Sequence, residues 1–505
     1  MNFKIPTIII KIVQEIKQQG FECYLVGGCV RDLLLEAKPN DWDITTNAKP
    51  EEIQKIFSQS IYENQFGTVG ILTGVSENTL KIVEVTTFRL EGRYSDKRHP
   101  DDIKFATTLQ EDLSRRDFTI NALALDIDLT HIKINTDKLV TPLSVKCQLI
   151  DLFNGRDDLK KGIIRAVGDP DKRFDEDALR LIKTVRCATQ LSFMIEQNTL
   201  ESLKRKAGNL QFIALERIRD ELIKIIMTPN AADGVRLLQN LGLLDYVIPE
   251  LIQTIGVAQN RHHIYTVWEH LLKSLDYSAK ENYSLEVRLA ALLHDIGKPQ
   301  TKQGEGVNAT FLNHEIASAK MAKHILNRLH FPNYILDKVV LLVRYHMFFY
   351  DPEISTDASL RRLLVKVGKD NIEDLAKLRE ADRIGSGCPK ALPFRLRHFM
   401  FRIEKILKDL QGETPSLKML KVNGNDLMQN IDIEPGPKLG FILNILLEEV
   451  LDDISKNTKE YLLQKAKELN NKDIQELKEL SEKARDRYNQ ILNEEEAEIK
   501  RKYYV

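Results

Sequence analysis

The chain has 505 residues, of which 73 are Lys or Arg and 74 are Asp or Glu, so its net charge at pH 7 is −1. This length exceeds what one small hydrophobic core organises, and we expect several domains. The charge balance excludes a uniformly basic coat for nucleic acid, although local basic patches are compatible with it.

Two further features concern the compartment. The five cysteines lie far apart, without the spacing of a metal site or a disulfide framework, which favours a reduced, cytoplasmic protein. The apolar run at residues 8–10 is broken by Lys11 and is too short to span a bilayer. No signal-peptide cleavage pattern follows it, and we expect no transmembrane segment.

The first 150 residues mix strand and helix signals. Residues 23–26 and 42–46 are typical of strands, and residues 30–37 between them are typical of a helix. Two β-rich runs, 67–75 and 80–88, flank the polar turn SENT and predict a hairpin.

From about Asp175 the pattern becomes almost wholly helical. One apolar stripe at helical spacing consists of Phe174, Ala178, Leu181, Ile182 and Val185. Breaks fall near Asn260, Cys388 and Pro435. The charged stretch from Asp473 predicts an amphipathic packing helix.

Gly27 and Gly28 separate the first predicted strand from the helix. A glycine turn in this position lets backbone N–H groups approach a phosphate, and the helix N-terminus adds positive potential. A diglycine alone is more often a simple tight turn, so its meaning depends on the carboxylates that follow.

Asp41 and Asp43 are two residues apart on a predicted strand, where alternation places both carboxylates on one face. Like charges held this close repel, so the pair indicates a hard divalent cation such as Mg²⁺. Glu84, in the second hairpin strand, is a candidate third acidic group, with an exposed strand glutamate as the alternative. A phosphate turn followed by a metal-binding strand predicts a nucleotide triphosphate site.

Six segments then occur in an order typical of one family: LVGGCVRDLLL, DWDI, TFRLEGRYSDKRHPDDIKF, DLSRRDFTINALA, RFDEDALRLIKTVR and ALERIRDELIKI. Together they resemble the class II tRNA nucleotidyltransferases, which are the CCA-adding enzymes, and the related bacterial poly(A) polymerases. Linked matches of this kind form a specific motif set, and they cover mainly the first half of the chain.

The resemblance implies that Asp41 and Asp43 are metal ligands and, with Glu84, form the catalytic acidic group. The residues it implies for nucleotide binding are Gly27, Gly28, Arg31, Arg116, Asp117 and Asn121. The last three match the family's ribose motif, and a ribose 2′-OH needs both the acceptor and the donors that these side chains supply.

Asp177 and Arg180 are three residues apart on a predicted helix and would share a face. An intrahelical salt bridge is the ordinary alternative, whereas the resemblance implies that they read the incoming base. An Asp acceptor beside an Arg donor matches cytosine and adenine, while uracil and guanine present the reversed pattern. The same resemblance makes Glu216, Arg217 and Glu221 positioning residues.

Two more segments resemble parts of the family. Residues 91–104 resemble the flexible loop that the family uses when it switches from C to A, which favours addition of the terminal A. Residues 420–463 resemble the tail that holds the tRNA elbow, although no strongly basic block marks them.

A second chemical site is predicted from histidines and aspartates later in the chain. The candidate ligands, in chain order, are His270, His294, Asp295, His314, His346 and Asp382. They resemble the ligand pattern of HD-type phosphohydrolases, and such a donor set suits Mn²⁺, Fe²⁺, Ni²⁺ or Mg²⁺. A lone histidine on an apolar helix is usually a core residue, but six ordered candidates favour a metal centre. Lys298 is a candidate phosphate-binding residue, and a purely structural HD domain is the alternative.

We therefore predict an α+β protein. Its expected parts are a polymerase-β-like nucleotidyltransferase head with a small sheet at 1–150, a helical neck for base and ribose recognition at 151–255, an HD domain at 256–390 and a helical tRNA-binding tail at 391–505.

The predicted function is untemplated addition of C, C and A from CTP and ATP to the tRNA 3′ end, with HD phosphohydrolysis as a second activity. An A-only enzyme and a poly(A) polymerase of the same family are alternatives, although the arginine-rich insertion expected of the latter is not seen near GTVGIL. An HD phosphohydrolase with a non-catalytic RNA-binding head is the alternative from another class, and the intact Asp41–Asp43 pair argues against it.

Overall fold

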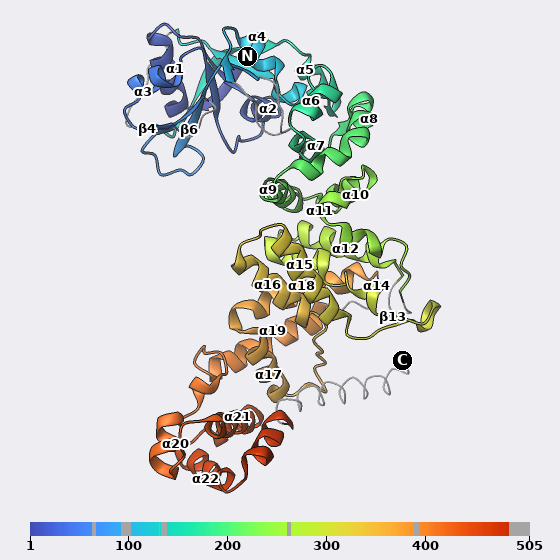
Figure 1. Ribbon diagram of the computed structural model, residues 1–505. Helices are drawn as coiled ribbons and strands as arrows, with labels where there is room; N and C mark the ends of the chain where they lie inside the picture. Colours follow the sequence, from blue (N-terminus) through green and yellow to red (C-terminus); the bar gives the residue numbers. More distant parts are fainter. Residues whose placement is uncertain are drawn as a thin grey trace. The chain divides into compact units, whose positions relative to one another are not determined.

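The computed structural model describes residues 1–62, 67–91, 103–130, 132, 139–259, 264–387 and 393–483. Clustering of the chain gives two compact units, Met1–Pro249 and Glu250–Val505 (Figure 1). Within the described ranges, no helix combines the length and hydropathy that crossing a bilayer requires.

The first unit begins with an eight-stranded sheet in the order β1-β10-β9-β2-β3-β6-β5-β4. The strands are β1 (Asn2–Pro6), β2 (Cys23–Val26), β3 (Asp43–Thr46), β4 (Ser60–Tyr62), β5 (Thr68–Leu72), β6 (Ile82–Thr87), β9 (Leu123–Ile127) and β10 (Pro142–Asp151). Only β3 and β6 run parallel; all other neighbours are antiparallel. The predicted strands near residues 23 and 43 and the β5–β6 hairpin are thereby confirmed.

Three short helices and one longer helix accompany the sheet: α1 (Thr7–Gln18), α2 (Gly28–Leu34), α3 (Pro50–Ile56) and α4 (Leu109–Ser114). In α1, Ile9, Val13 and Ile16 recur at helical spacing and are 0% exposed, because they pack into the core formed with the strands. The Thr108 hydroxyl accepts from the Glu111 N–H at the start of α4, which fixes where that helix begins.

The rest of the first unit is mainly helical. Its helices are α5 (Gly155–Lys161), α6 (Pro170–Glu176), α7 (Leu179–Leu191), α8 (Gln197–Lys206), α9 (Leu215–Ile226), α10 (Ala231–Asn240) and α11 (Leu244–Val247), and β11 (Ile163–Ile164) pairs with β12 (Met194–Ile195). The apolar stripe from Phe174 to Val185 is fully buried, as predicted. It does not lie on one helix, however, because the chain breaks between Glu176 and Leu179.

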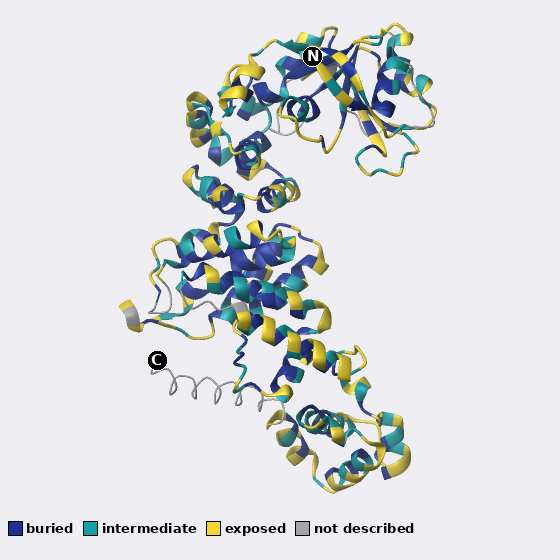
Figure 2. Ribbon diagram, turned by 180° about the vertical axis from the view of Figure 1, so that it is seen from behind, coloured by how far each residue is buried: buried dark blue, intermediate teal, exposed yellow. Residues whose placement is uncertain are grey.

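In the part of the second unit that the structure describes, the secondary structure is helical, apart from a short hairpin of β13 (Lys302–Gln303) and β14 (Thr310–Phe311). Its helices are α12 (Val267–Lys280), α13 (Leu285–Leu293), α14 (Lys298–Thr301), α15 (His314–Arg328), α16 (Asn333–Tyr345), α17 (Asp357–Val367), α18 (Lys369–Gly385), α19 (Pro393–Asp409), α20 (Gly424–Ile431), α21 (Pro437–Asp452) and α22 (Lys459–Asn470). Side-chain caps at Thr266 and Ser284 start α12 and α13. Figure 2 shows the buried residues on the inner faces of the packed helices and the exposed residues on their outer faces.

Several predicted features lie wholly or partly outside the described residues. Most of the predicted loop at 91–104 does so, although its ends pair with each other as β7 (Arg89–Glu91) and β8 (Ile103–Phe105). The predicted breaks near Asn260 and Cys388 also fall there, and the C-terminal helix is described only as far as residue 483.

Candidate active site and metal centre

The glycine turn lies directly against the predicted acidic pair. Gly27 has φ +79° at the end of β2, and Gly28 begins α2. A Cβ on Gly27 would stand 3.1 Å from Asp43 Oδ2 and 3.0 Å from Arg116 Nη1. A Cβ on Gly28 would stand 3.8 Å from Asp41 Oδ1. Glycine is thus favoured at position 27 by its positive φ and by the closeness of these side chains, and the turn brings bare backbone up to the carboxylates.

The acidic residues converge as predicted, with one correction. Asp43 is the first residue of β3 and pairs in register with Glu84 of β6. Asp41 is not on the strand, because β3 begins only where it pairs with β2 and β6; the residue lies in the bend before it. Asp41 and Glu84 are exposed, whereas Asp43 is half-buried.

The electrostatics of this group fit a cation. Burial, followed by the neighbouring charge of Asp41, raises the pKa of Asp43 to about 6, although Arg116 opposes the shift and Glu84 adds to it. A carboxylate that is costly to ionise among other carboxylates is stabilised by a divalent ion with oxygen preference. The residues present therefore fit the predicted metal.

Three of the predicted nucleotide-binding residues are joined by hydrogen bonds. Arg31 Nη1 donates to Asn121 Oδ1 at 3.0 Å, and Asn121 Nδ2 donates to Asp117 Oδ1 at 3.1 Å. Burial opposes ionisation of Asp117, but Lys183, Asn121 and Arg180 lower its pKa, so it stays an acceptor.

Sequence reasoning missed the residue that orients Arg116. Asp112, on α4, is 0% exposed, and its Oδ2 accepts from Arg116 Nη2 at 3.3 Å. Its Oδ1 accepts from Arg115 Nη2 at 2.7 Å. The signal was available, because an aspartate three and four residues before two arginines pairs with both on a helical turn.

Asp177 and Arg180 are close in the chain but not on one helix, which corrects the prediction of a shared helical face. Asp177 follows the last residue of α6, and Arg180 lies in the first turn of α7. Asp177 Oδ2 accepts from Arg217 Nη2 at 3.2 Å, while Arg180 Nη1 donates to Glu176 Oε2 at 2.6 Å.

Of the three predicted positioning residues, Arg217 contacts Asp177, and Glu216 is exposed on α9. The third, Glu221, is 3% exposed and accepts from Arg186 Nε at 2.6 Å. Arg217 is therefore the α9 residue that links this helix to Asp177.

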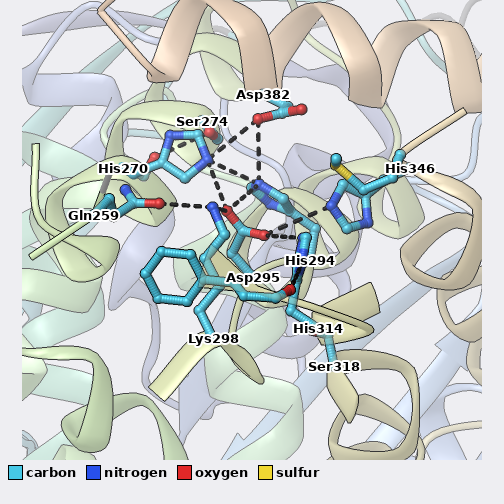
Figure 3. Close-up of polar contacts among 12 residues, drawn as sticks. Gln259, His270, Ser274, His294, Asp295, Lys298, His314, Ser318, His346 and Asp382 are labelled. Carbon is cyan, nitrogen blue, oxygen red and sulfur yellow. Dashed lines mark hydrogen bonds and ion pairs between the residues drawn. The ribbon is translucent and has the colours of Figure 1, made fainter. Parts of the chain in front are cut away.

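The six predicted HD ligands come together from helices α12, α15 and α18 and from the turns after α13 and α16 (Figure 3). His270 Nε2 lies 3.2 Å from Asp295 Oδ2 and 3.2 Å from Asp382 Oδ1. His294 Nε2 lies 3.4 Å from the same Asp295 oxygen. Asp295 Oδ1 lies 3.2 Å from His314 Nε2 and 3.6 Å from His346 Nε2. Asp295 thus joins two groups of candidate ligands.

Backbone contacts prepare these histidines as ligands. Each of three donates from Nδ1 to the carbonyl three residues earlier, at 2.9 Å for His294 and 2.7 Å for His314 and His346. Because a carbonyl only accepts, Nδ1 carries a proton in all three, so the neutral form of each ring turns the Nε2 lone pair toward the cluster. Within the described chain, Asp295 Oδ1 and His314 Nε2 are buried without a hydrogen-bond partner. These observations fit a metal centre.

Burial and the neighbouring carboxylates shift the histidine pKa values in opposite directions. Burial lowers the pKa of His346 to about 4. Burial also acts to lower the pKa of His294, but Asp295 and Asp382 raise it to about 10. A metal ion would take the place of that His294 proton between the carboxylates.

Lys298 lies beside the cluster, but its ammonium group is already engaged. Lys298 Nζ is 2.6 Å from Asp295 Oδ2 and donates to Gln259 Oε1 at 2.6 Å. Gln259 was not predicted, since no local pattern marks a residue that tertiary packing brings from 39 positions away. The lysine therefore neutralises Asp295 in this structure.

The head and the HD cluster together define a nucleotidyltransferase with an appended HD domain, and comparisons with known proteins agree. Family models match a poly A polymerase head domain at residues 23–165, a "probable RNA and SrmB- binding site of polymerase A" at 192–254 and an HD domain at 262–385. Both domain families are metal-dependent in general, and the described residues include groups able to hold an ion.

Relatives match along nearly the whole chain. The CCA-adding enzyme of Ligilactobacillus salivarius (strain UCC118) is 31% identical, covering 91% of this chain and 95% of the relative. That of Lactococcus lactis subsp. lactis (strain IL1403) is 32% identical, covering 91% and 96%. The crystal structure of the Bacillus stearothermophilus CCA-adding enzyme in complex with CTP has a TM-score of 0.67 at 27% identity, covering 92% of this chain and 97% of that one. The chain belongs to the CCA-adding enzyme family, which confirms the predicted resemblance, fold class and enzyme class.

Proposed function

We propose that this chain adds C, C and A from CTP and ATP to the 3′ end of tRNA without a nucleic-acid template. The observation that carries the proposal is the convergence of Gly27 and Gly28, Asp41, Asp43 and Arg116 at one place in the head. Such a group offers a triphosphate both open backbone and positive charge, next to carboxylates that fit a metal. The relatives of similar length are CCA-adding enzymes, which supports the same reaction here.

Asp41 and Asp43, with Glu84 in register, would hold Mg²⁺. When bound, the metal would lower the pKa of the attacking 3′-hydroxyl and stabilise charge on the α-phosphate. The chain's own contribution is orientation. The turn at Gly27 and Gly28 admits the triphosphate, and Arg116, held by Asp112, supplies fixed positive charge beside it.

The Arg31–Asn121–Asp117 network would hold the ribose. Asp117 is kept ionised and would accept a hydrogen bond from the ribose 2′-hydroxyl. Asn121 and Arg116 would donate hydrogen bonds to the ribose oxygens. Because Asp117 is half-buried, an analogue without the 2′-hydroxyl would leave part of its acceptor capacity unpaired.

Asp177 and Arg180 would read the base. Their hydrogen-bonding capacity is met by Arg217, Glu176 and backbone carbonyls. A cytosine or adenine edge would replace part of these contacts with a donor for Asp177 and an acceptor for Arg180. Uracil or guanine would present the opposite groups and leave both residues unpaired, which is the basis of selection.

The chain's parts would divide this work. We assign the head to 1–150, the neck to 151–255, the HD domain to 256–390 and the tRNA-binding tail to 391–505. A cytoplasmic location, inferred from the cysteines, belongs to the same proposal.

The test is incubation with tRNA ending at the discriminator base, at CC and at CCA, with CTP and ATP supplied separately and together. Full CCA addition predicts that the first end is completed only with both nucleotides. An A-only enzyme would extend only the CC end, and a poly(A) polymerase would continue past CCA. No extension of any end would refute the proposal.

A second function, metal-dependent hydrolysis of a phosphate ester at the HD cluster, is supported by the six buried ligands that meet at Asp295. A divalent ion of the Mn²⁺, Fe²⁺, Ni²⁺ or Mg²⁺ kind would activate water there. The substrate we favour is a 2′,3′-cyclic phosphate, because that group blocks the 3′-hydroxyl that the head must extend.

The two functions are separable by experiment. Hydrolysis of 2′,3′-cyclic nucleotides, 2′-nucleotides and generic phosphate esters is screened with each metal, using wild type and the His294→Ala/Asp295→Ala variant. We expect the variant to lose hydrolysis and keep nucleotide addition. Absence of turnover by wild type with every metal would leave the HD domain as a structural body.

A further inference from the structure

Helix α19 (Pro393–Asp409) carries an exposed face unlike any other in the tail. Its buried side consists of Leu396, Phe399, Ile403 and Ile406. On the opposite side, Phe394 is 49% and Phe401 63% exposed, and these are the exposed phenylalanines of the second unit's described residues. An amphipathic helix normally presents polar residues there, so two large apolar rings need an explanation.

Basic side chains surround these rings. Arg397, Lys405 and Lys408 are exposed and, with Phe394 and Phe401, recur at spacings of three, four and seven residues, which place them on one face. Among the described residues none of these three cations has a side-chain ion pair or hydrogen bond. The face thus combines three basic side chains with two aromatic rings, and the exposed Glu404 lies one turn before Lys408.

The other two arginines of α19 differ from these cations, because each is paired with a carboxylate. Arg402 Nε donates to Asp357 at 3.1 Å, and Arg395 Nη1 lies 3.4 Å from Asp351. Those two cations join the helix to the rest of the unit. The helix therefore uses some basic residues internally and leaves the others facing outward.

The charge of α19 distinguishes it from the segment expected to hold tRNA. It has five basic and two acidic residues. Helices α20, α21 and α22, which lie largely in the predicted tail segment at 420–463, together have four basic and six acidic residues. Of these four helices, α19 therefore has the largest positive net charge.

We infer that this face of α19 is a tRNA-binding surface, with its cations on the sugar–phosphate backbone and its rings against ribose or unpaired bases. A membrane surface fits less well, because the two rings are separated by two helical turns and form no continuous apolar face. The inference rests on the proposed function for the identity of the RNA. It moves the main contact from the segment at 420–463 to α19.

The experiment measures binding of labelled tRNA by fluorescence anisotropy over a series of salt concentrations, without nucleotide. We expect Lys405→Ala/Lys408→Ala to weaken binding about tenfold and to reduce the salt slope by about 1.5. Phe394→Ala/Phe401→Ala should weaken binding to a similar degree with the slope unchanged, because stacking releases no counterions. Since all four side chains are exposed, the melting temperature should not fall.

The matched control is Lys320→Ala/Lys323→Ala, two exposed lysines with the same spacing on α15. It should bind tRNA like wild type. Equal losses in the control, normal binding by both α19 variants, or no tRNA binding by wild type would each overturn the inference. A change in molecular mass by light scattering, with tRNA binding intact, would show a self-association face instead.

The same variants separate this inference from the proposed reaction. In a nucleotide-addition assay the α19 variants should raise the apparent KM for tRNA by the factor seen in binding. A wild type that binds tRNA through α19 but adds no nucleotide would refute the reaction and leave the surface standing.

Discussion

The head site and the HD centre both gather carboxylates, but in opposite surroundings. In the head, Asp41 and Glu84 are exposed, and a glycine turn and Arg116 face the group. In the HD centre all six candidate ligands are at most 7% exposed, and four of them are histidines. One site is open and made of oxygen donors, and the other is closed and rich in nitrogen.

The difference indicates how each site would obtain its metal. Exposed carboxylates bind Mg²⁺ weakly and share it with substrate phosphates, so the head metal would arrive with the nucleotide. Buried imidazoles with fixed tautomers bind transition metals tightly, so the HD metal would be resident. We expect four experiments to test this contrast and the residues that support it.

The largest expected effect is at the head. Asp43→Ala or Asp41→Ala should lower nucleotide incorporation by about a thousandfold, because several kcal/mol of charge stabilisation would be lost. Single-turnover incorporation on tRNA ending in CC measures it. The HD metal content of the same variant is the control and should match wild type. Incorporation near the wild-type rate would remove these residues from the metal site.

The second experiment removes the residue that joins the two HD groups. Asp295→Ala should lose nearly all metal retained after dialysis, whereas His346→Ala should retain about half, since it contributes to one group only. Metal is measured by inductively coupled plasma mass spectrometry, and nucleotide addition should persist in both variants. Wild-type metal content in Asp295→Ala would contradict a shared ligand.

The sequence predicted the chemistry of these sites better than their local geometry. The pairing of a glycine turn with Asp43 followed from what phosphates and metals require. The first residue of the strand could not be predicted in this way. Strand β3 begins where Val26 and Glu84 pair with Asp43, and Asp41 lies before it. Strand ends depend on partners that are distant in the chain.

The helix break at Asp177 was missed for a different reason. Apolar spacing from Phe174 to Val185 runs unbroken through it, and burial of that stripe was correctly predicted. Asp177 Oδ1 nevertheless accepts from the Leu179 N–H at 3.0 Å, which starts a new helix. An aspartate at a helix start is a recognisable signal, but the unbroken apolar spacing favoured one continuous helix.

For Gln259, no pattern in the sequence indicated that it would contact Lys298.

The third experiment concerns base selection. Asp177→Ala and Arg180→Ala should each relax discrimination against UTP and GTP by about ten- to a hundredfold, because the mismatched partner that imposed 1–3 kcal/mol would be absent. Competition between CTP and UTP on one tRNA end measures the ratio. Arg219→Ala, on the same helix as Arg217 but paired with Asp220, should leave selection unchanged. Unchanged rejection of UTP in both variants would place base reading elsewhere.

The smallest expected effect is at Asp112, which holds Arg116 from behind. Asp112→Asn keeps the shape but loses the charge, and should raise the KM for CTP a few-fold and lower the free energy of unfolding by about 2 kcal/mol at pH 7.

The difference in the free energy of unfolding between wild type and Asp112→Asn should depend on pH in a direction that follows from the pKa of Asp112. Burial raises the pKa of Asp112, but Arg115 and Arg116 hold it below its usual value. A folded pKa below the unfolded one contributes stability above the unfolded pKa, near 3.9, and that contribution is lost as the pH falls through the folded value. The difference between wild type and Asp112→Asn should therefore be full at pH 7 and disappear in acid. Asp220→Asn, at an exposed carboxylate, should show no such change in urea unfolding, and a difference for Asp112→Asn that persists at the lowest pH would mean that packing, not charge, keeps Arg116 in place.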